Sequence, residues 1–193
     1  MQPELVTVPE YLQGARIFLR PYTLADAAAQ WAAIEESRSH LQRWIRHAPS
    51  LKSVDDVGVA LAHDRAQWVL RKRLIFGVFE HANGGYLGQS AFHHIDWKVP
   101  TFELGYWLRR SAEGHGYMRE AVGLMSRLAF DQLGARRIEA RVNPRNLRSR
   151  RVLEALGWEC EGRLRQCARD AEGVLIDVDV FALVSAPSGH SCQ

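Results

Sequence analysis

The stretch from Thr101 to Met118, TFELGYWLRRSAEGHGYM, constrains the fold of this chain more than any other segment. It predicts an alternating strand, a loop with glycines at 114 and 116, and a helix whose apolar residues recur at helical spacing before Gly134. Such a loop presents unpaired backbone N–H groups and the positive end of the helix dipole, which suits a pyrophosphate. Taken alone, the pattern is more typical of a simple tight turn.

A second informative segment, ARVNPRNLRSRRVLEALGWECEG, spans residues 140–162. It predicts the end of a strand over 137–142, a polar turn, a helix over about 146–156 and a new strand from Trp158. Gly157 is the expected C-terminal stop of that helix. The two segments together therefore form a β-α-β-α-β half.

Together these segments resemble the acyl-CoA-binding half of the GNAT N-acyltransferases, with the RimJ/RimL branch the most similar. The resemblance rests on ELGYWL, the EGHGYM loop, the N-x-x-S pair Asn146 and Ser149, LGW at 156–158 and EG at 161–162. It extends more loosely to RIFLRPYT (16–23) and HLQRWIRHAPS (40–50), so it covers nearly the whole chain. The resemblance implies an enzyme that transfers an acetyl or other acyl group from acetyl-CoA, or another acyl-CoA, to a primary amine.

The composition argues against membrane, secreted and nucleic-acid-binding proteins. The 193 residues are 47% hydrophobic and 24% charged, which predicts one ordinary globular domain. The sequence shows no apolar run long enough for a membrane span, no secretory leader and no C-x-x-C pair. A formal net charge of +3 is too small to indicate nucleic acid. We therefore expect a cytoplasmic protein with no membrane, nucleic-acid or metal partner, and the sequence leaves open whether it forms a homo-oligomer.

The order of elements predicts an α+β (mixed α/β) fold of the GNAT type, with a splayed, mixed sheet of six or seven strands flanked by helices. The domain should span residues 1–184, followed by a disordered tail at 185–193. Expected strands lie at 16–23, 74–80, 86–95, 101–108 and 137–142, from 158, and at 174–184. Expected helices follow Thr23, whose step to Asp26 resembles a capping box, and lie at 40–46, 53–71, 118–129 and 146–156.

The resemblance assigns the co-substrate to two places. The phosphates fall to backbone N–H groups of the loop residues Glu113, Gly114, His115, Gly116, Tyr117 and Met118. The family usually has Arg or Gln three residues before the first glycine, and Ser111 here removes one side-chain contact. The peptide-like pantetheine arm is expected to pair with an exposed strand edge formed by Gly105, Tyr106, Trp107 and Leu108.

Catalytic candidates are Ser149 and Glu103. Asn146 and Ser149 share a helix face, and an asparagine there is also typical of a plain N-cap. In the resemblance Asn146 contacts the pantetheine and Ser149 lies near the thiol, so Ser149 is the candidate for protonating or hydrogen-bonding the leaving thiolate, alone or with a water. Many relatives carry a tyrosine acid one turn further along this helix, where this chain has Leu153.

The general base is less well defined by the sequence. Some relatives have a carboxylate where this chain has Ala168, so the candidates are Glu103, His93 and His94. Glu103 lies in a mostly apolar strand and shares one face with Gly105 and Trp107. Alternation along the strand would send the two histidines to opposite faces, so at most one should reach the site.

The acceptor is expected to meet the helical region that contains His40, Trp44 and His47, together with the loop before the last strand. It is a protein N-terminal α-amine or a small-molecule amine. An α-amine has a pKa of about 8, against about 10.4 for lysine, so a weakly defined base favours α-amines. A non-catalytic acyl-CoA sensor is the alternative, favoured by Leu153 and Ala168. The sequence does not fit a dinucleotide-binding oxidoreductase, because the loop lacks the G-x-G-x-x-G spacing.

Overall fold

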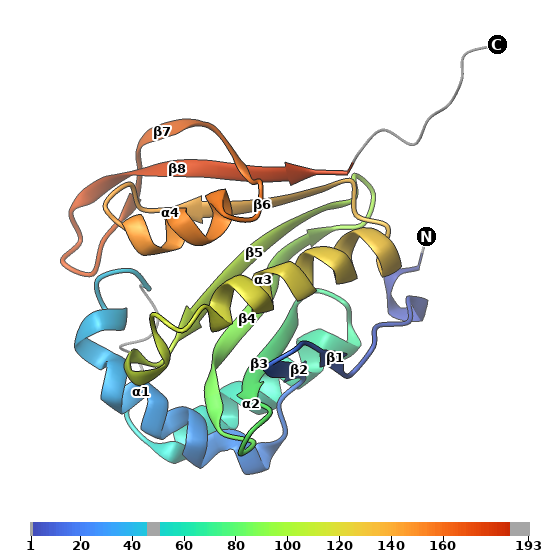
Figure 1. The fold of residues 1–193 in the computed structure, drawn as a ribbon, viewed down its shortest axis with the longest axis vertical. Helices are drawn as coiled ribbons and strands as arrows, with labels where there is room; N and C mark the ends of the chain where they lie inside the picture. The colour runs from blue at the N-terminus through green and yellow to red at the C-terminus, as the bar shows by residue number, and fades with distance from the viewer. Residues whose placement is uncertain (1, 46–50, 186–193) are drawn as a thin grey trace.

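The computed structural model of the chain describes residues 2–45 and 51–185, which form a mixed sheet flanked by helices on both faces (Figure 1). Eight strands lie in the order β1-β2-β3-β4-β5-β6-β8-β7. Their bounds are β1 (Leu12–Gln13), β2 (Ile17–Arg20), β3 (Leu74–Glu80), β4 (Tyr86–Asp96), β5 (Thr101–Leu108), β6 (Arg137–Val142), β7 (Glu159–Arg169) and β8 (Leu175–Val184). Neighbouring strands are antiparallel except β5 and β6, which are parallel.

The helices cover the two faces as separate pairs. They are α1 (Ala27–Leu41), α2 (Val54–Val69), α3 (Tyr117–Arg127) and α4 (Leu147–Glu154). Short 3-10 turns lie at Pro3–Leu5, Leu24–Asp26 and Arg110–Ala112, and α3 continues as a π-helical turn at Leu128–Gln132. Ile34 of α1 and Val57 of α2 pack in one buried cluster with Ile75 and Ala91. The apolar faces of α3 and α4 pack in the other cluster, around Phe92, Phe102 and Ile138.

The sheet splits between β5 and β6. The two strands pair only where Thr101–Glu103 faces Arg137–Glu139. Beyond Glu103, β5 turns away from β6 (Figure 1). The edge of β5 from residue 104 to residue 108 therefore has no partner strand on that side, and the first turns of α3 and α4 both begin at this opening.

Most predicted elements are confirmed, and the predicted splayed sheet is present with eight strands rather than six or seven. The additional strand, β1, is two residues long, too short to show a period in sequence. The turn over Asn83, Gly84 and Gly85 joins β3 to β4, and Gly84 has the positive φ of 69° that this turn needs. The N–H of Thr23 donates to Asp26 Oδ2 at 2.7 Å, which confirms the capping box.

One prediction at the end of an element is wrong. No separate helix begins at His40, because α1 runs without a break through His40 to Leu41, and the described chain then makes a turn over 42–44. The end of that predicted helix at Arg46 lies outside the described residues. At the start of the predicted tail, the N–H of Ser185 donates to the Arg136 carbonyl at 3.0 Å. The rest of the predicted disordered tail, 186–193, lies outside the described residues.

Candidate active site

Two cavities meet where β5 leaves β6. The first, about 560 Å³, lies between the first turns of α3 and α4 and is called the α3–α4 cavity. The second, about 840 Å³, lies on the α1 and α2 face and is called the α1–α2 cavity. They share seven lining residues: Leu41, Trp44, Ile45, Tyr106, Trp107, Asn146 and Ser149. Molecules entering from opposite faces of the sheet can therefore meet at this point.

The loop before α3 has the backbone geometry of an anion site. Gly114 and Gly116 have φ values of +84° and +78°, in the left-handed region that glycine adopts without strain. Gly116 is the N-cap, and the N–H of Glu120 makes the first bond of the helix, to the Gly116 carbonyl at 3.2 Å. The N–H groups of residues 117–119 therefore have no acceptor inside the helix. This arrangement suits a phosphate group.

Side chains of this loop point in two directions. Glu113 and Met118 line the α3–α4 cavity with the two glycines. His115 and Tyr117 do not line it. The His115 carbonyl accepts from Arg16 Nη1 at 2.8 Å, and the Tyr117 hydroxyl donates to Glu80 at 2.5 Å. Any contact of these two residues with a ligand in the cavity would come from their backbone.

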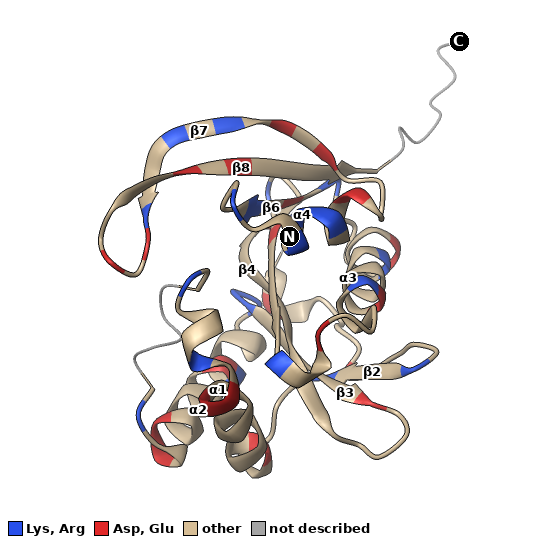
Figure 2. Ribbon diagram, turned by 60° about the vertical axis from the view of Figure 1, so that its left-hand side comes forward, with Lys and Arg blue, Asp and Glu red and all other residues tan. Residues whose placement is uncertain are grey.

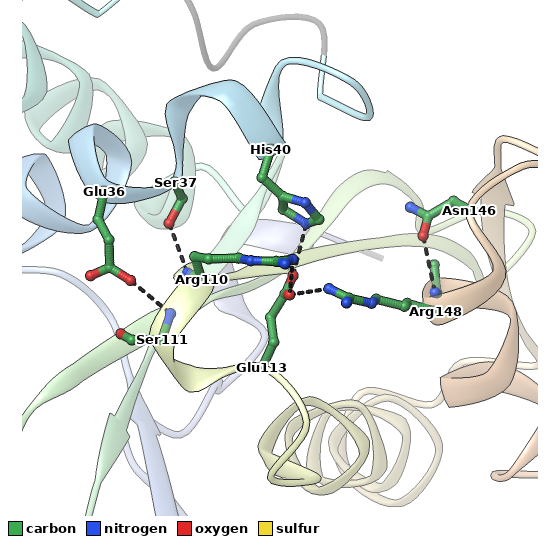
Figure 3. A network of polar contacts seen from close by, with 9 residues as sticks. Glu36, Ser37, His40, Arg110, Ser111, Glu113, Asn146 and Arg148 are labelled. Carbon is green, nitrogen blue, oxygen red and sulfur yellow. Dashed lines mark hydrogen bonds and ion pairs between the residues drawn. The ribbon is translucent and has the colours of Figure 1, made fainter.

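Glu113 is the centre of a polar network that joins both sides of the opening (Figure 3). Its carboxylate lies 2.7 Å from His40 Nε2, 2.7 Å from Arg110 Nη1 and within contact of Arg148 Nη1. Burial lowers the pKa of His40, as do Arg110, Arg148 and Arg43, and Glu113 opposes them. The arginine charges outnumber the one carboxylate, so the mouth of the cavity favours an anion.

Arginines of α4 form part of the wall of this cavity. Arg148 and Arg151 both line the α3–α4 cavity. Figure 2 shows the basic residues on α4, next to β6. The available signal was the run of arginines at 148–151, placed directly after the predicted turn that faces the phosphate loop.

Ser111, which replaces the usual Arg or Gln of the loop, has a structural role in this chain. Its N–H donates to Glu36 Oε1 of α1 at 2.7 Å, and the neighbouring N–H of Arg110 donates to Ser37 Oγ at 2.8 Å (Figure 3). Arg109 also donates to Glu36, at 2.8 Å. The approach to the loop is thus fixed by two backbone N–H groups and by the Arg109 side chain.

The start of α4 brings Ser149 to the shared wall of the two cavities. Asn146 caps the helix, because its Oδ1 accepts from the N–H of Ser149 at 3.2 Å. Ser149 Oγ lies 2.9 Å from the Tyr106 hydroxyl, which also donates to the Ser149 carbonyl at 3.2 Å. Burial raises the pKa of Tyr106 to about 12, so the phenol keeps its proton at neutral pH. Leu153 is fully buried in the core and leaves no acidic group one turn further along.

Glu103 lies in the α1–α2 cavity with Gly105 and Trp107, as their shared strand face predicts. Its Oε2 is 3.1 Å from His94 Nδ1 and 3.7 Å from Arg141 Nε. Glu103 therefore has two cationic or polar neighbours rather than a purely apolar setting. Its side chain is 23% exposed, so it can reach a ligand or water in the cavity.

The prediction that His93 and His94 lie on opposite faces is wrong. The pairing of β4 with β5 shifts register between Phe92 and His94, so two residues of β4 occupy the space of one. Such a bulge breaks the alternation of side chains. Both histidines consequently line the α1–α2 cavity.

Other sequence-based expectations for the acceptor region have mixed outcomes. Trp44 lines both cavities and is only partly buried, so it belongs to the site rather than to the core. His40 lines the α3–α4 cavity, and His47 lies outside the described residues. Neither Ala168 nor the loop at 170–174 lines either cavity.

Within 2–45 and 51–185, no group of three or more His, Cys, Asp or Glu side chains is arranged to hold a metal ion. In that same part of the chain, every helix is too short or too polar to cross a membrane.

Comparison with known proteins identifies the family. The family described as "Acetyltransferase (GNAT) domain" matches residues 16–159, and the chain belongs to this family. It is 31% identical over 176 residues to the "Probable N-acetyltransferase YjcK" of Bacillus subtilis (strain 168), covering 90% of this chain and 97% of that protein. The predicted family and reaction are thus confirmed, and the chain is an N-acetyltransferase that uses an acyl-CoA.

Solved structures show the same fold. RimL, a ribosomal L7/L12 alpha-N-protein acetyltransferase in complex with coenzyme A, superposes with a TM-score of 0.86 at 18% identity, covering 91% of this chain and 98% of that one. Mycobacterium smegmatis RimJ in complex with CoA-disulfide gives a TM-score of 0.84 at 24% identity, with 96% and 90% covered. The predicted GNAT fold is therefore confirmed.

Proposed function

We propose that this enzyme transfers an acetyl group from acetyl-CoA to an α-amine. Acetyl-CoA would bind in the α3–α4 cavity and the acceptor in the α1–α2 cavity. One observation carries this proposal: the two cavities open from opposite faces of the sheet and share a wall at Tyr106 and Ser149. A thioester and an amine held on either side of that wall come together without a rearrangement of the sheet. Such positioning alone supplies a large share of a rate enhancement.

The co-substrate would be held mainly by backbone groups. The pyrophosphate would lie over Glu113–Met118, on the unpaired N–H groups and the positive end of α3. Arg148 and Arg151 lie on the opposite wall, where they would neutralise phosphate charge. The pantetheine would pair with the free edge of β5 at Tyr106, Trp107 and Leu108, with the side-chain amide of Asn146 facing it.

The chemistry needs a proton acceptor for the amine and a proton donor for the departing thiolate. The amine nitrogen forms the new bond to the acetyl carbon, and the carbon–sulfur bond breaks. The Glu103–His94 pair would take the amine proton, directly or through a water, from the acceptor side. Ser149 Oγ would hydrogen-bond the departing thiolate and pass it a proton that a water molecule replaces on the hydroxyl, and its contact with Tyr106 would keep the hydroxyl in place.

An α-amine is the acceptor that this site supports best. Glu103 and His94 are open to solvent and paired with each other, and they do not form the enclosed base that a lysine side chain would require. An α-amine has a pKa of about 8, so a usable fraction is already neutral near pH 7. RimL, which shares the fold, acts on a protein α-amine according to its description. A small molecule with an α-amine is equally compatible with the 840 Å³ cavity.

A two-stage screen tests this function. Acyl-CoAs are first ranked by their thermal shift on the protein, and acetyl-CoA should give one of the largest shifts. The best donor is then offered a panel of amino-acid amides, short peptides, lysine derivatives and polyamines, with release of the CoA thiol as the readout. Tight acyl-CoA binding without turnover of any amine would contradict the proposal and favour the non-catalytic sensor.

A further inference from the structure

The proposed mechanism leaves His93 of β4 without a role, although its ring lines the α1–α2 cavity. Its Nδ1 lies 3.1 Å from Arg73 Nη2. A guanidinium only donates hydrogen bonds and stays protonated in proteins, so Nδ1 must be the acceptor of this bond. The single proton of a neutral His93 ring is therefore on Nε2.

The ring of His93 is held neutral and fixed in place. Burial lowers its pKa to about 4, and the nearby charges of Arg73 and His94 act in the same direction. Arg73 is itself oriented by Asp64 of α2, with Nη1 3.4 Å from Asp64 Oδ1. At neutral pH, His93 thus offers one N–H donor in a fixed direction and no free proton acceptor.

The ring of His93 lies against β5, near the start of its free edge. A methyl group built at Gly105 would lie 2.7 Å from His93 Nε2 and Cδ2, so the ring edge rests against the backbone of Gly105. The described residues supply no hydrogen-bond partner for Nε2. Among the described residues, the side-chain polar atoms that are both buried and without a hydrogen-bond partner are Ser90 Oγ and Trp158 Nε1. His93 Nε2 also has no partner but is not one of these buried atoms, so it is open to the cavity.

We propose that the Nε2–H of His93 binds an oxygen of the acceptor next to its reacting amine, and so selects α-amino acyl compounds over simple alkylamines. The oxygen is the main-chain carbonyl of a peptide N-terminus, or the corresponding carbonyl of an amino-acid amide. This inference rests on the proposed function, because it requires the acceptor to occupy the α1–α2 cavity. A donor left without a partner penalises any acceptor that lacks this oxygen.

The two adjacent histidines would then have opposite tasks. Glu103 accepts a hydrogen bond from His94 Nδ1 when that nitrogen carries the proton, which leaves His94 Nε2 free to accept one. His93 has the reverse arrangement, with Nδ1 occupied and Nε2–H free. One ring assists proton removal from the amine, while the other holds the acyl part of the same acceptor.

Two substitutions separate the Nδ1 acceptor of His93, which binds Arg73, from its Nε2–H donor. His93→Asn places an amide oxygen near the position of Nδ1, where it can still accept from Arg73, but it removes the donor near Nε2. His93→Gln places its amide nitrogen near the position of Nε2 and restores the donor. His63→Asn on α2 is the matched control, since His63 is exposed and lines neither cavity.

Each variant is assayed with an amino-acid amide and with an alkylamine of similar size. For the amide, His93→Asn should lower kcat/KM about tenfold to a hundredfold, mainly through KM, because a single hydrogen bond to a buried group is lost. For the alkylamine the change should be under about threefold, and His93→Gln should recover most of the activity toward the amide. The KM for acetyl-CoA should not change, and His63→Asn should behave as wild type.

The outcomes distinguish this inference from the proposed function. A wild-type enzyme that acetylates neither acceptor refutes the proposed function. Equal losses for both acceptors in His93→Asn, or no loss in either, refute the role of His93 alone. Nitrogen-15 NMR of the ring gives a readout without turnover. A proton on Nδ1, or titration near pH 6.5, would also overturn the inference.

Discussion

The two sides of the opening between β5 and β6 are built in different ways. The α3–α4 side depends on short segments, the loop at 113–118 and the helix start at 146–149, and much of its binding capacity is backbone N–H. The α1–α2 side depends on side chains from α1, α2, β4, β5 and β6, which include Asp64, His93 and Glu103. A common co-substrate can be bound by local backbone geometry, whereas recognition of a particular acceptor needs side chains that only the tertiary fold assembles.

Polar contacts of Ser149 and Glu113 join the two sides. Ser149 on the co-substrate side is bonded to Tyr106, whose ring lines both cavities. Glu113 of the phosphate loop is bonded to His40 at the end of α1 and to Arg148 of α4. Substitutions on each side, and at the wall between them, therefore test the proposed division: co-substrate binding on the α3–α4 side, acceptor binding on the α1–α2 side and acetyl transfer at the shared wall.

The largest effect is expected at the shared wall. Ser149→Ala should lower kcat about 10²–10⁴-fold, because the leaving thiolate loses its proton donor. The KM for acetyl-CoA should change little. Tyr106→Phe is the matched variant, since it removes the same 2.9 Å hydrogen bond but keeps the serine hydroxyl. The measurement is steady-state kcat of both variants, with their melting temperatures. If Ser149→Ala keeps full turnover and an unchanged melting temperature, water or another group is the acid.

The next largest effect is expected on the acceptor side. Glu103→Gln should lower kcat about 10²-fold near neutral pH, because the amine loses its proton acceptor. The loss should shrink as pH rises above the amine pKa of about 8, where the acceptor arrives neutral. Glu139→Gln is the control, since Glu139 also pairs with Arg141, at 3.6 Å, but lines neither cavity. A small loss that is the same at every pH would assign Glu103 to a structural role.

A smaller effect should appear in co-substrate affinity. Gly116→Ala should weaken acetyl-CoA binding about tenfold, because a side chain at φ +78° is strained by roughly 1–2 kcal/mol and the loop changes shape to relieve it. Gly157→Ala carries the same strain at φ +77°, with no neighbour to touch and no cavity to line. Calorimetric titration of both variants separates loop shape from general destabilisation. Equal affinities of Gly116→Ala and Gly157→Ala for acetyl-CoA would exclude this loop as the phosphate site.

The smallest effect is expected at the cap of α4. Asn146→Ala should cost about 0.5–2 kcal/mol of stability and weaken acetyl-CoA binding a few-fold, because the cap and the amide facing the cavity are both lost. Ser53→Ala removes the corresponding cap of α2, where Ser53 Oγ accepts from the N–H of Asp56 at 3.1 Å. If the two variants lose stability equally and both keep wild-type affinity, Asn146 is only a cap.

The sequence allowed a good prediction of the helices and strands and of the family. Hydrophobic periodicity and glycine stops located α3, α4 and the main strands to within a few residues. The prediction failed at two places. At His40 a new helix was expected, but α1 continues through this residue. At His93 and His94 a β-bulge breaks the alternation of side chains between the two faces of the strand. The bonding of Ser149 to Tyr106 was also missed, because these residues lie on different elements and no spacing rule relates them.

What the sequence determined by itself is local: the order of helices and strands, the loop with glycines at 114 and 116, the cap at Asn146 and the family. These follow from backbone conformation and short-range hydrogen bonds, which residues close together in the chain control. Only the tertiary structure decided which charges face one another: Glu113 with His40 and Arg148, Glu103 with His94, and Arg73 with the ring of His93. The physical reason is that hydrogen bonds and charge interactions depend on distance in space, and packing of helices on a split sheet sets those distances.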